Sequence, residues 1–494
     1  MITDMKYTPE SGGVSSAALL KLLKKADRKK IPLHSLLIAK GDDILLNAYW
    51  KPFSKEAPHR MNSVTKSFVS LAVGSLVAEG RLMLTDRVID YFPECSEFDL
   101  SEEFSKETVY DLLTMRTPYV LVPGKHWVKF KLYDRIRNYF ESKPFKPKQT
   151  LFYYDSPASY ILCVIIERLT GTSFLDYLKA RVLDKIGFSR SSDCIKDAAG
   201  YSWGDSGLLC TTEDLYRVGR LITCGGKWDG EQLMDKGYLE AAISSHGSSC
   251  DNGNDENHGS YGYGYQIWRE RYEGFGFHGM GMQYMISIPE KDLIICCTAD
   301  TQGNDPARAI FIDMLFDFID EEVLDGALPE DPIAYGKLLE YIDGLKLVSI
   351  GGSPTSDIAG SIGNKRVILN ENPMGLKWIK LDFEKGEFIY ENQQGEKRLG
   401  FGVLENVFTE FPQDGYDNMK IGESPFGYRH PCAVSAAWLD GSTFGIKVQA
   451  IGNHLGGLFI RIGFDGTRVG LHMQKTTECF FNEYSGYAIG RIED

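Results

Sequence analysis

Residues 62–80, NSVTKSFVSLAVGSLVAEG, contain the most informative pattern in the sequence. From Ser63 onward the residues are mostly apolar and Gly80 ends the run, so we expect a helix over residues 63–79. Ser63 is the only serine in the chain that a lysine follows three residues later. Because positions three apart share one face of a helix, the amine of Lys66 can lie beside the hydroxyl of Ser63.

This pairing has a chemical use. A serine hydroxyl needs a base to act as a nucleophile, and a lysine supplies one where desolvation or neighbouring positive charge lowers its pKa. The backbone N–H groups at the start of a helix also stabilise negative charge that develops during attack on a carbonyl. The S-x-x-K pattern alone occurs by chance and a helical lysine is usually solvated, so the spacing by itself leaves a structural role open.

The composition is that of a folded globular protein. The chain has 494 residues, of which 43% are hydrophobic and 25% charged, and its net charge is −14. At roughly 100 to 200 residues per domain, this length indicates two to four domains. The sequence pI near 5.3 argues against binding to nucleic acid, which depends on clustered lysine and arginine.

The sequence also bears on the cellular compartment. Residues 1–13, MITDMKYTPESGG, lack the apolar core of a secretion signal. The best apolar run, residues 160–166, ends at Glu167 and Arg168 and is far shorter than a membrane span. Ten cysteines form no C-x-x-C pair, which favours reduced thiols. We therefore expect a cytoplasmic protein with no membrane partner.

Strand patterns lie at both ends of the first 330 residues, with helical patterns between them over residues 63–245. The expected strands form a hairpin over 33–50 and three further segments over 261–270, 274–281 and 282–299. Because the strands come from both ends and the helices from the middle, we expect an α+β fold in which helices flank one antiparallel sheet.

The pattern changes near residue 347. Beyond it, alternating segments are separated by the turn pairs Lys385-Gly386, Gln394-Gly395, Asp440-Gly441 and Asp465-Gly466. Alternation with such turns predicts a separate antiparallel β domain, closed as a barrel or sandwich. We therefore expect a first domain over residues 1–330 and a C-terminal β domain over residues 346–494.

The residues from Asn62 to Asp86 resemble the nucleophile helix of the serine β-lactamase-like hydrolases, which include class C β-lactamases, penicillin-binding proteins, esterases and amidases. Two further segments resemble elements of this family in the same order, residues 108–115, TVYDLLTM, and residues 207–215, GLLCTTEDL. The resemblance covers residues 30 to 320. It implies a β-lactamase-like sheet flanked by helices, and some relatives carry a lipocalin-like or other β module after it.

The resemblance also implies site residues. Ser63 takes the place of the nucleophile and Lys66 that of its base, while Tyr154 in FYYDS takes the place of the tyrosine that relays protons. The alternative is that Tyr154 has a structural role and only anchors the start of a helix. The following pair, Asp155 and Ser156, lacks the amide that is common in this motif, so substrate preference does not carry over.

The third motif of the family, Lys-Thr-Gly or His-x-Gly, is replaced by residues 277–284, FHGMGMQY. His278 resembles its first residue, and Gly279 and Gly281 keep the strand slim where substrate approaches. A backbone N–H of this strand, such as that of Gly281, would form an oxyanion hole with the N–H of Ser63. Met280 stands where the family has glycine, so the alignment of this segment with the family motif is open by one or two residues. The alternative for His278 is a histidine of the cleft or core that transfers no proton.

No metal or organic cofactor is expected. The polar tract over residues 251–258 is similar to a calcium loop, but Gly253 occupies a ligand position and Gly262 stands where a bidentate glutamate is needed. A solvated loop is the favoured interpretation of this tract.

We therefore expect a serine hydrolase that cleaves a small ester, amide or short peptide substrate through a Ser63 acyl-enzyme. A cytoplasmic location and the lack of Lys-Thr-Gly make cell-wall transpeptidation and β-lactam hydrolysis the less favoured activities. Two alternatives stay open: a catalytically weak β-lactamase-like binding protein, and a penicillin-binding D-amino-acid peptidase. The sequence does not indicate the natural substrate, the oligomeric state or the role of the β domain.

Overall fold

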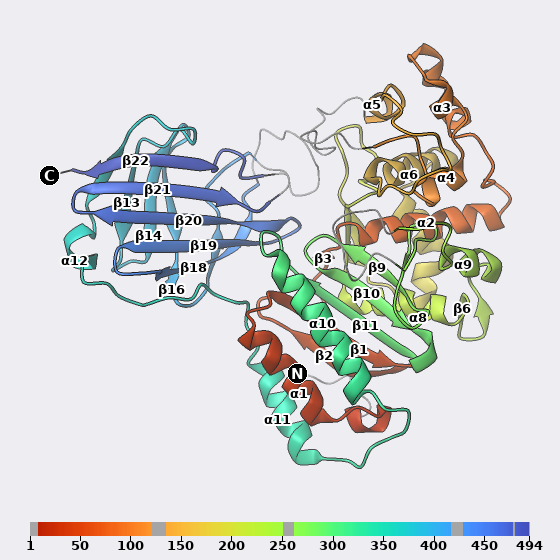
Figure 1. Ribbon diagram of the computed structural model, residues 1–494, viewed down its shortest axis with the longest axis horizontal. Coiled ribbons are helices and arrows are strands. Elements are labelled where there is room, and N and C mark those ends of the chain that lie inside the picture. The colour runs from red at the N-terminus through yellow and green to blue at the C-terminus, as the bar shows by residue number, and fades with distance from the viewer. Residues whose placement is uncertain (1–7, 121–134, 250–260, 416–427, 478–479, 494) are drawn as a thin grey trace. The chain divides into compact units, whose positions relative to one another are not determined.

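The computed structural model describes residues 8–120, 135–249, 261–415, 428–477 and 480–493 (Figure 1). These residues form two compact units, one made mainly of the chain up to Lys346 and the other mainly of the chain from Leu347 onward. Independent folding of the expected domains, residues 1–330 and 346–494, stays a prediction. Limited proteolysis between residues 325 and 346 would test it.

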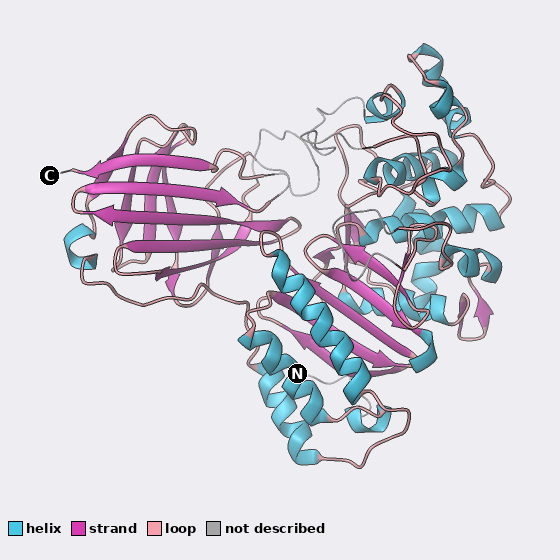
Figure 2. Cartoon of the chain, viewed as in Figure 1, coloured by secondary structure: helices cyan, strands magenta, loops and turns pink. Residues whose placement is uncertain are grey.

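A six-stranded sheet forms the centre of the first unit, in the order β2-β1-β11-β10-β9-β8. Figure 2 shows its strands in magenta with helices around them. Its strands are β1 (Leu33–Lys40), β2 (Asp43–Tyr49), β8 (Trp268–Arg269), β9 (Phe275–Gly279), β10 (Gln283–Ile288) and β11 (Leu293–Ala299). All neighbouring pairs are antiparallel, and β1 pairs with β11 so that Leu33 lies opposite Ala299. The sheet therefore joins the two ends of this part of the sequence, as expected.

Both faces of this sheet are buried, which explains why its central strands are largely apolar on both faces. In β11, Ile294 and Cys296 belong to one hydrophobic core, whereas Leu293, Ile295 and Cys297 belong to another. Successive residues of a strand point to opposite faces, so a strand covered on both sides needs apolar residues throughout. The helices that complete the second core are α1 (Ser16–Arg28), α10 (Asp305–Glu322) and α11 (Pro332–Asp343).

The opposite face carries the larger helical layer. Its helices are α2 (Val64–Ala78), α3 (Glu102–Ser105), α4 (Val109–Leu113), α5 (Arg135–Phe140), α6 (Ser156–Thr170), α7 (Phe174–Leu178), α8 (Thr212–Thr223) and α9 (Lys236–Ala242). Short strands accompany them, β3 (His59–Arg60), β4 (Asp193–Cys194), β5 (Leu208–Cys210), β6 (Lys227–Trp228) and β7 (Glu231–Gln232). Helix α2 is buried almost all round, and Gly80 ends its last turn with φ 67°. The helix expected over residues 63–79 is confirmed within one residue at each end.

The strand expected over residues 261–270 is wrong except near its end, where β8 covers Trp268–Arg269. The backbone N–H of Tyr265 donates to the carbonyl of Ala242, and that of Gln266 donates to the carbonyl of Leu113, each at 3.0 Å. Gln266 also has φ 57°, which no regular strand contains. The backbone of this segment therefore follows an irregular path, and the ring of Tyr265 packs against Tyr110 of α4 and Tyr238 of α9.

The second unit is one eleven-stranded sheet, in the order β15-β14-β13-β12-β22-β21-β20-β19-β18-β16, with β17 paired to β18. Its elements are α12 (Ala359–Ile362), β12 (Arg366–Leu369), β13 (Trp378–Asp382), β14 (Glu387–Asn392), β15 (Gly395–Gly400), β16 (Gly402–Val403), β17 (Val407–Glu410), β18 (Pro431–Trp438), β19 (Thr443–Ile451), β20 (Leu455–Asp465), β21 (Arg468–Lys475) and β22 (Gly486–Ile492).

This sheet curls into a nearly closed barrel around a single hydrophobic core. All its named strand pairs are antiparallel except β16 with β18. The four expected turn pairs all fall at the junctions of consecutive strands. The expected fold class, an α+β unit with a flanked antiparallel sheet followed by an antiparallel barrel, is confirmed.

Among the described helices, none by itself has the length and apolar character needed to cross a membrane. Helix α6 and the helical segment Phe174–Ile186, bent by 67° relative to each other, pass that test only as a pair.

Candidate active site

Ser63 lies directly before α2, at the position that would normally cap the helix. Its own backbone is helical, with φ −66° and ψ −8°, and its side chain makes no capping hydrogen bond. The hydroxyl instead accepts a hydrogen bond from Lys66 Nζ at 2.8 Å. The S-x-x-K spacing therefore brings these two groups together and leaves the serine oxygen free of the helix backbone.

Lys66 is held in one place by its surroundings. Its side chain is buried, whereas Ser63 is only half-buried. Nζ also donates to the carbonyl oxygen of Asp205 at 2.7 Å and lies 5.1 Å from the centre of the Tyr154 ring. The structure thus places Ser63, Lys66 and Tyr154 side by side, the three residues that the resemblance selected.

The end of strand β9 packs against the residues that precede Ser63. A Cβ atom at Gly279 would lie 2.3 Å from the carbonyl oxygen of Met61, so only glycine fits there. Asn62, with φ 47°, donates from Nδ2 to the carbonyl of Met280 at 2.7 Å. Both contacts fix the backbone of β9 beside the start of α2.

Gly281 lies elsewhere in the turn after β9. Its φ is 82°, and a Cβ there would come within 3.0 Å of the Gln283 side chain and 3.4 Å of the Ala299 carbonyl. Gly279, not Gly281, is therefore the glycine that borders the Ser63 segment. These contacts narrow the alignment of residues 277–284 with the family's third motif, which the sequence left open by one or two residues.

Asp155, between Tyr154 and Ser156, caps helix α6. Its carboxylate accepts hydrogen bonds from the Thr117 hydroxyl at 2.7 Å and from the Ala158 backbone N–H at 3.3 Å. Burial raises the pKa of Asp155 to about 7, although both hydrogen bonds and the charge of Lys66 act against the rise. Ser156 is the first residue of α6 and is half-buried.

His278 is one ring away from Tyr154. Trp268 stacks on Tyr154, with ring centroids 5.5 Å apart, and on His278, with centroids 5.6 Å apart. His278 Nε2 is hydrogen bonded to the carboxylate of Glu270, which is 3% exposed. Trp268 and Glu270 belong to the segment that was expected to be a strand, and no motif marked them as site residues.

Within the described ranges, no group of three or more histidine, cysteine, aspartate or glutamate side chains is arranged to hold a metal ion. The polar tract over residues 251–258 lies outside those ranges.

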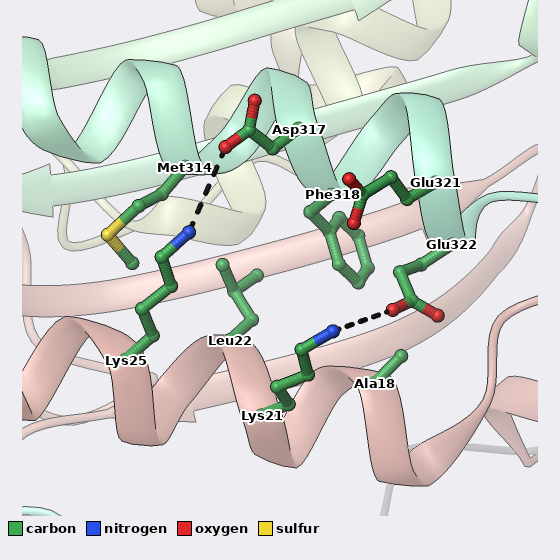
Figure 3. A pocket seen from close by; sticks show the side chains of 9 residues that line it. All are labelled: Ala18, Lys21, Leu22, Lys25, Met314, Asp317, Phe318, Glu321 and Glu322. Atoms are coloured by element: carbon green, nitrogen blue, oxygen red, sulfur yellow. Dashed lines mark hydrogen bonds and ion pairs between the residues drawn. The ribbon is translucent and has the colours of Figure 1, made fainter.

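A surface groove between α1 and α10 lies on the side of the central sheet that faces away from α2 (Figure 3). Leu22, Met314 and Phe318 contribute apolar side chains to it. Two ion pairs cross it, Lys21 with Glu322 at 3.2 Å and Lys25 with Asp317 at 3.8 Å. Its lining contains neither a serine nor a cysteine.

The flanked sheet and the serine paired with a lysine at a helix start define a hydrolase of the serine type. The family model described as Beta-lactamase matches residues 20–313, which is more than half of the chain. The chain therefore belongs to the beta-lactamase family.

Individual relatives agree with this assignment. A 6-aminohexanoate-dimer hydrolase from Paenarthrobacter ureafaciens is 24% identical over an alignment of 273 residues, and the match covers 50% of this chain and 68% of that protein. A "putative 6-aminohexanoate-dimer hydrolase" from Bacillus anthracis has 20% identity and a TM-score of 0.51, covering 62% of this chain and 83% of its own. A "putative beta-lactamase" from Bacteroides dorei has 15% identity and a TM-score of 0.50, covering 62% and 100%. The two solved structures show a shared fold.

Proposed function

We propose that the chain hydrolyses an ester or amide bond of a small substrate through an acyl-enzyme on Ser63. The observation that carries this proposal is the 2.8 Å hydrogen bond between Lys66 Nζ and a serine that does not cap its helix. A nucleophile and a base within hydrogen-bond reach are the geometric requirement for covalent catalysis.

In the first step, Lys66 in its amine form accepts the hydroxyl proton of Ser63 while Oγ attacks the carbonyl carbon. A C–O bond forms, and the carbonyl electron pair moves onto the oxygen. We assign the backbone N–H groups of Ser63 and Met280 as the oxyanion donors, since no acceptor for either lies among the described residues. The contact of Gly279 with Met61 supports this assignment because it holds Met280 beside Ser63.

In the second step, the tetrahedral intermediate expels the leaving group and its C–O or C–N bond breaks. The proton held by Lys66 passes to the leaving atom through Tyr154, whose ring lies next to Nζ. Water then attacks the Ser63 ester, with Lys66 and Tyr154 taking and returning a proton in the same way. The acid product leaves and the Ser63 hydroxyl is restored.

The relatives bear on the choice of substrate. A dimer of an amino acid is joined by an amide, so the name of the 6-aminohexanoate-dimer hydrolase favours amides and short peptides over esters. A penicillin-binding peptidase is the alternative that a substrate panel containing D-amino-acid peptides and nitrocefin would separate. The cytoplasmic location expected from the sequence is part of the same proposal, and cell fractionation would test it.

A fluorophosphonate probe tests the proposed nucleophile. We expect labelling of wild type at Ser63, identified by peptide mass spectrometry, together with a burst in p-nitrophenyl ester hydrolysis. Ser63→Ala removes both signals, whereas Ser75→Ala on the same helix keeps them. Equal labelling of the wild type and Ser63→Ala contradicts the proposal and returns the chain to the binding-protein alternative.

A further inference from the structure

A buried pair of side chains, Glu270 and His278, joins the β8–β9 connection to strand β9. Oε1 of Glu270 and Nε2 of His278 are hydrogen bonded, and the two side chains are 1% and 13% exposed. When this carboxylate is ionised it only accepts hydrogen bonds, and the ring then donates from an N–H at Nε2. The contact therefore fixes which edge of the imidazole faces the carboxylate and which edge faces away.

The backbone makes room for this pair. At Gly276, which precedes His278 by two residues on β9, a Cβ atom would lie 2.8 Å from Glu270 Oε1 and 3.2 Å from His278 Nε2. Any other residue at Gly276 would push the two groups apart. The backbone N–H of Glu270 donates to the carbonyl of Gly274 at 2.9 Å, and this hydrogen bond closes the connection between β8 and β9.

Rings on both neighbouring strands hold the imidazole. Trp268 of β8 stacks on it at 5.6 Å with an interplanar angle of 16°, and Tyr284 of β10 contacts it at 4.6 Å. Arg308 of α10 donates to the Tyr284 hydroxyl at 3.5 Å. Among the residues that the structure describes, the titratable groups with a recorded contact to His278 are Glu270 and Tyr284, and Arg308 contacts Tyr284.

The same stack leads to the site. Trp268 also stacks on Tyr154, at 5.5 Å and 20°, and the Tyr154 ring lies 5.1 Å from Lys66 Nζ. Phe152 and Tyr263 contact Trp268 as well. Because His278 contacts Trp268 and Trp268 contacts Tyr154, a rotation of His278 would displace Trp268, which is one of the two rings that contact Tyr154 within the described part of the chain. A catalytic group misplaced by about 1 Å costs on the order of a hundredfold in rate.

We propose that Glu270 is a positioning residue for the reaction on Ser63: its carboxylate holds His278 against Trp268, and this stack holds Tyr154 beside Lys66. The inference rests on the proposed function and deepens it. Glu270 touches neither Ser63 nor Lys66 by any recorded contact within the described residues, so it acts through the rings.

The test compares Glu270→Ala and Glu270→Gln with Glu273→Ala. Glu273 lies in the same connection but is 85% exposed and pairs with Arg269, so it is a matched control. We expect Glu270→Ala to lower kcat for p-nitrophenyl acetate by about ten- to a hundredfold with little change in KM. Glu270→Gln restores most of the rate because its amide oxygen still accepts from Nε2–H. Glu273→Ala behaves as wild type.

Two further measurements separate positioning from a merely structural role. In a His278→Ala background, Glu270→Ala should cost nothing more, since it acts through that ring. The fluorescence of Trp268, isolated by subtracting the spectrum of Trp268→Phe, should change in Glu270→Ala and not in Glu273→Ala. Thermal unfolding of each variant defines the temperature below which all remain folded, and rates are compared there.

The outcomes are distinct. If Ser63 is labelled and both Glu270 variants keep the wild-type kcat, the inference is overturned while the proposed function stands. Full additivity with His278→Ala, or an equal loss in Glu273→Ala, also overturns it. If the fluorophosphonate does not label Ser63 in wild type, the proposed function fails and this inference fails with it.

Discussion

Helices α2 and α6 both begin at the candidate active site, and their starting residues serve different purposes. Each helix has 15 residues and is mostly buried. At the start of α6, Asp155 accepts the Ala158 N–H and caps the helix in the usual way. At the start of α2, Ser63 occupies the same position, yet its side chain caps nothing and is paired with Lys66.

The difference shows how a site can be recognised from helix ends. A serine at an N-cap stabilises a helix by about 0.5–2 kcal/mol through its side-chain oxygen. Helix α2 forgoes that contribution and relies on the burial of most of its residues. A polar residue that could stabilise a structure and does not is available for chemistry, and the four expected outcomes below test this interpretation from the largest effect to the smallest.

Replacing Ser63 by alanine should abolish hydrolysis, with kcat falling by about 10⁶-fold, because loss of the nucleophile removes the covalent pathway. The free energy of unfolding of Ser63→Ala should stay within about 0.5 kcal/mol of that of wild type, since no cap is lost. Steady-state kinetics and thermal unfolding measure the two effects. If Ser63→Ala kept its activity and lost about 0.5–2 kcal/mol of unfolding free energy, as the loss of a cap does, Ser63 would be the capping residue and not the nucleophile.

Lys66→Met should lower kcat by about 10²- to 10⁴-fold through loss of the base. The substitution replaces a buried amino group by an apolar chain of similar length and removes the cost of burying a polar group, so the free energy of unfolding should be unchanged or higher. Chemical denaturation and p-nitrophenyl ester kinetics check both statements. A variant that is both fully active and less stable would make Lys66 a structural residue.

The stability contributed by the start of α6 should depend on pH. The pKa of Asp155 is about 7 in the folded chain, compared with about 3.9 for an exposed aspartate. The folded state therefore binds the proton more tightly, and this group's contribution to stability is full below pH 4 and declines as the pH rises to 7, by up to about 4 kcal/mol.

Asp155→Asn should remove that decline while keeping the cap, because the amide oxygen accepts from Ala158 and Thr117 can turn its hydroxyl to accept. Denaturant titrations of both proteins between pH 4 and pH 7 measure the difference in slope. Parallel slopes for the two proteins would show that Asp155 does not titrate in this range.

Asp155→Ala isolates the cap itself. At pH 5, below the pKa of the folded carboxyl, we expect a loss of about 1–2 kcal/mol in the free energy of unfolding, because the hydrogen bonds to Ala158 and Thr117 disappear. Ser63→Ala measured beside it should lose less than half as much. Equal losses in the two variants would remove the distinction between the two helix starts.

Local signals allowed much of the fold to be predicted. Gly80 ends α2 in a left-handed conformation, and Asp440-Gly441 lies at the turn between β18 and β19. Such features depend on a few neighbouring residues. Helix α1 carries a similar signal, since Ser15 caps it by accepting from the Ala18 N–H, although α1 is not among the predicted helices.

Features that depend on distant partners could not be predicted. Gln266 leaves the strand pattern because its backbone bonds to Leu113, 153 positions earlier in the chain. Glu270, flanked by arginines in the sequence, has the pattern of a solvated charge, and its burial against His278 follows from the pairing of β8 with β9. Ser63 and Lys66 were predictable because a single helix turn joins them, whereas Gly279 needed the contact with Met61 to be distinguished from Gly281.

The pairing of β1 with β11 sets a time scale for the growing chain. Leu33 emerges early from the ribosome, but Ala299, its partner, is made only after the intervening helices. At about 5–20 residues per second, the interval is roughly 15 to 50 s. During this time the apolar β1–β2 hairpin lacks β11, the strand that pairs with β1 in the folded sheet. We therefore expect the yield of active protein to depend on the rate of synthesis and on access to chaperones.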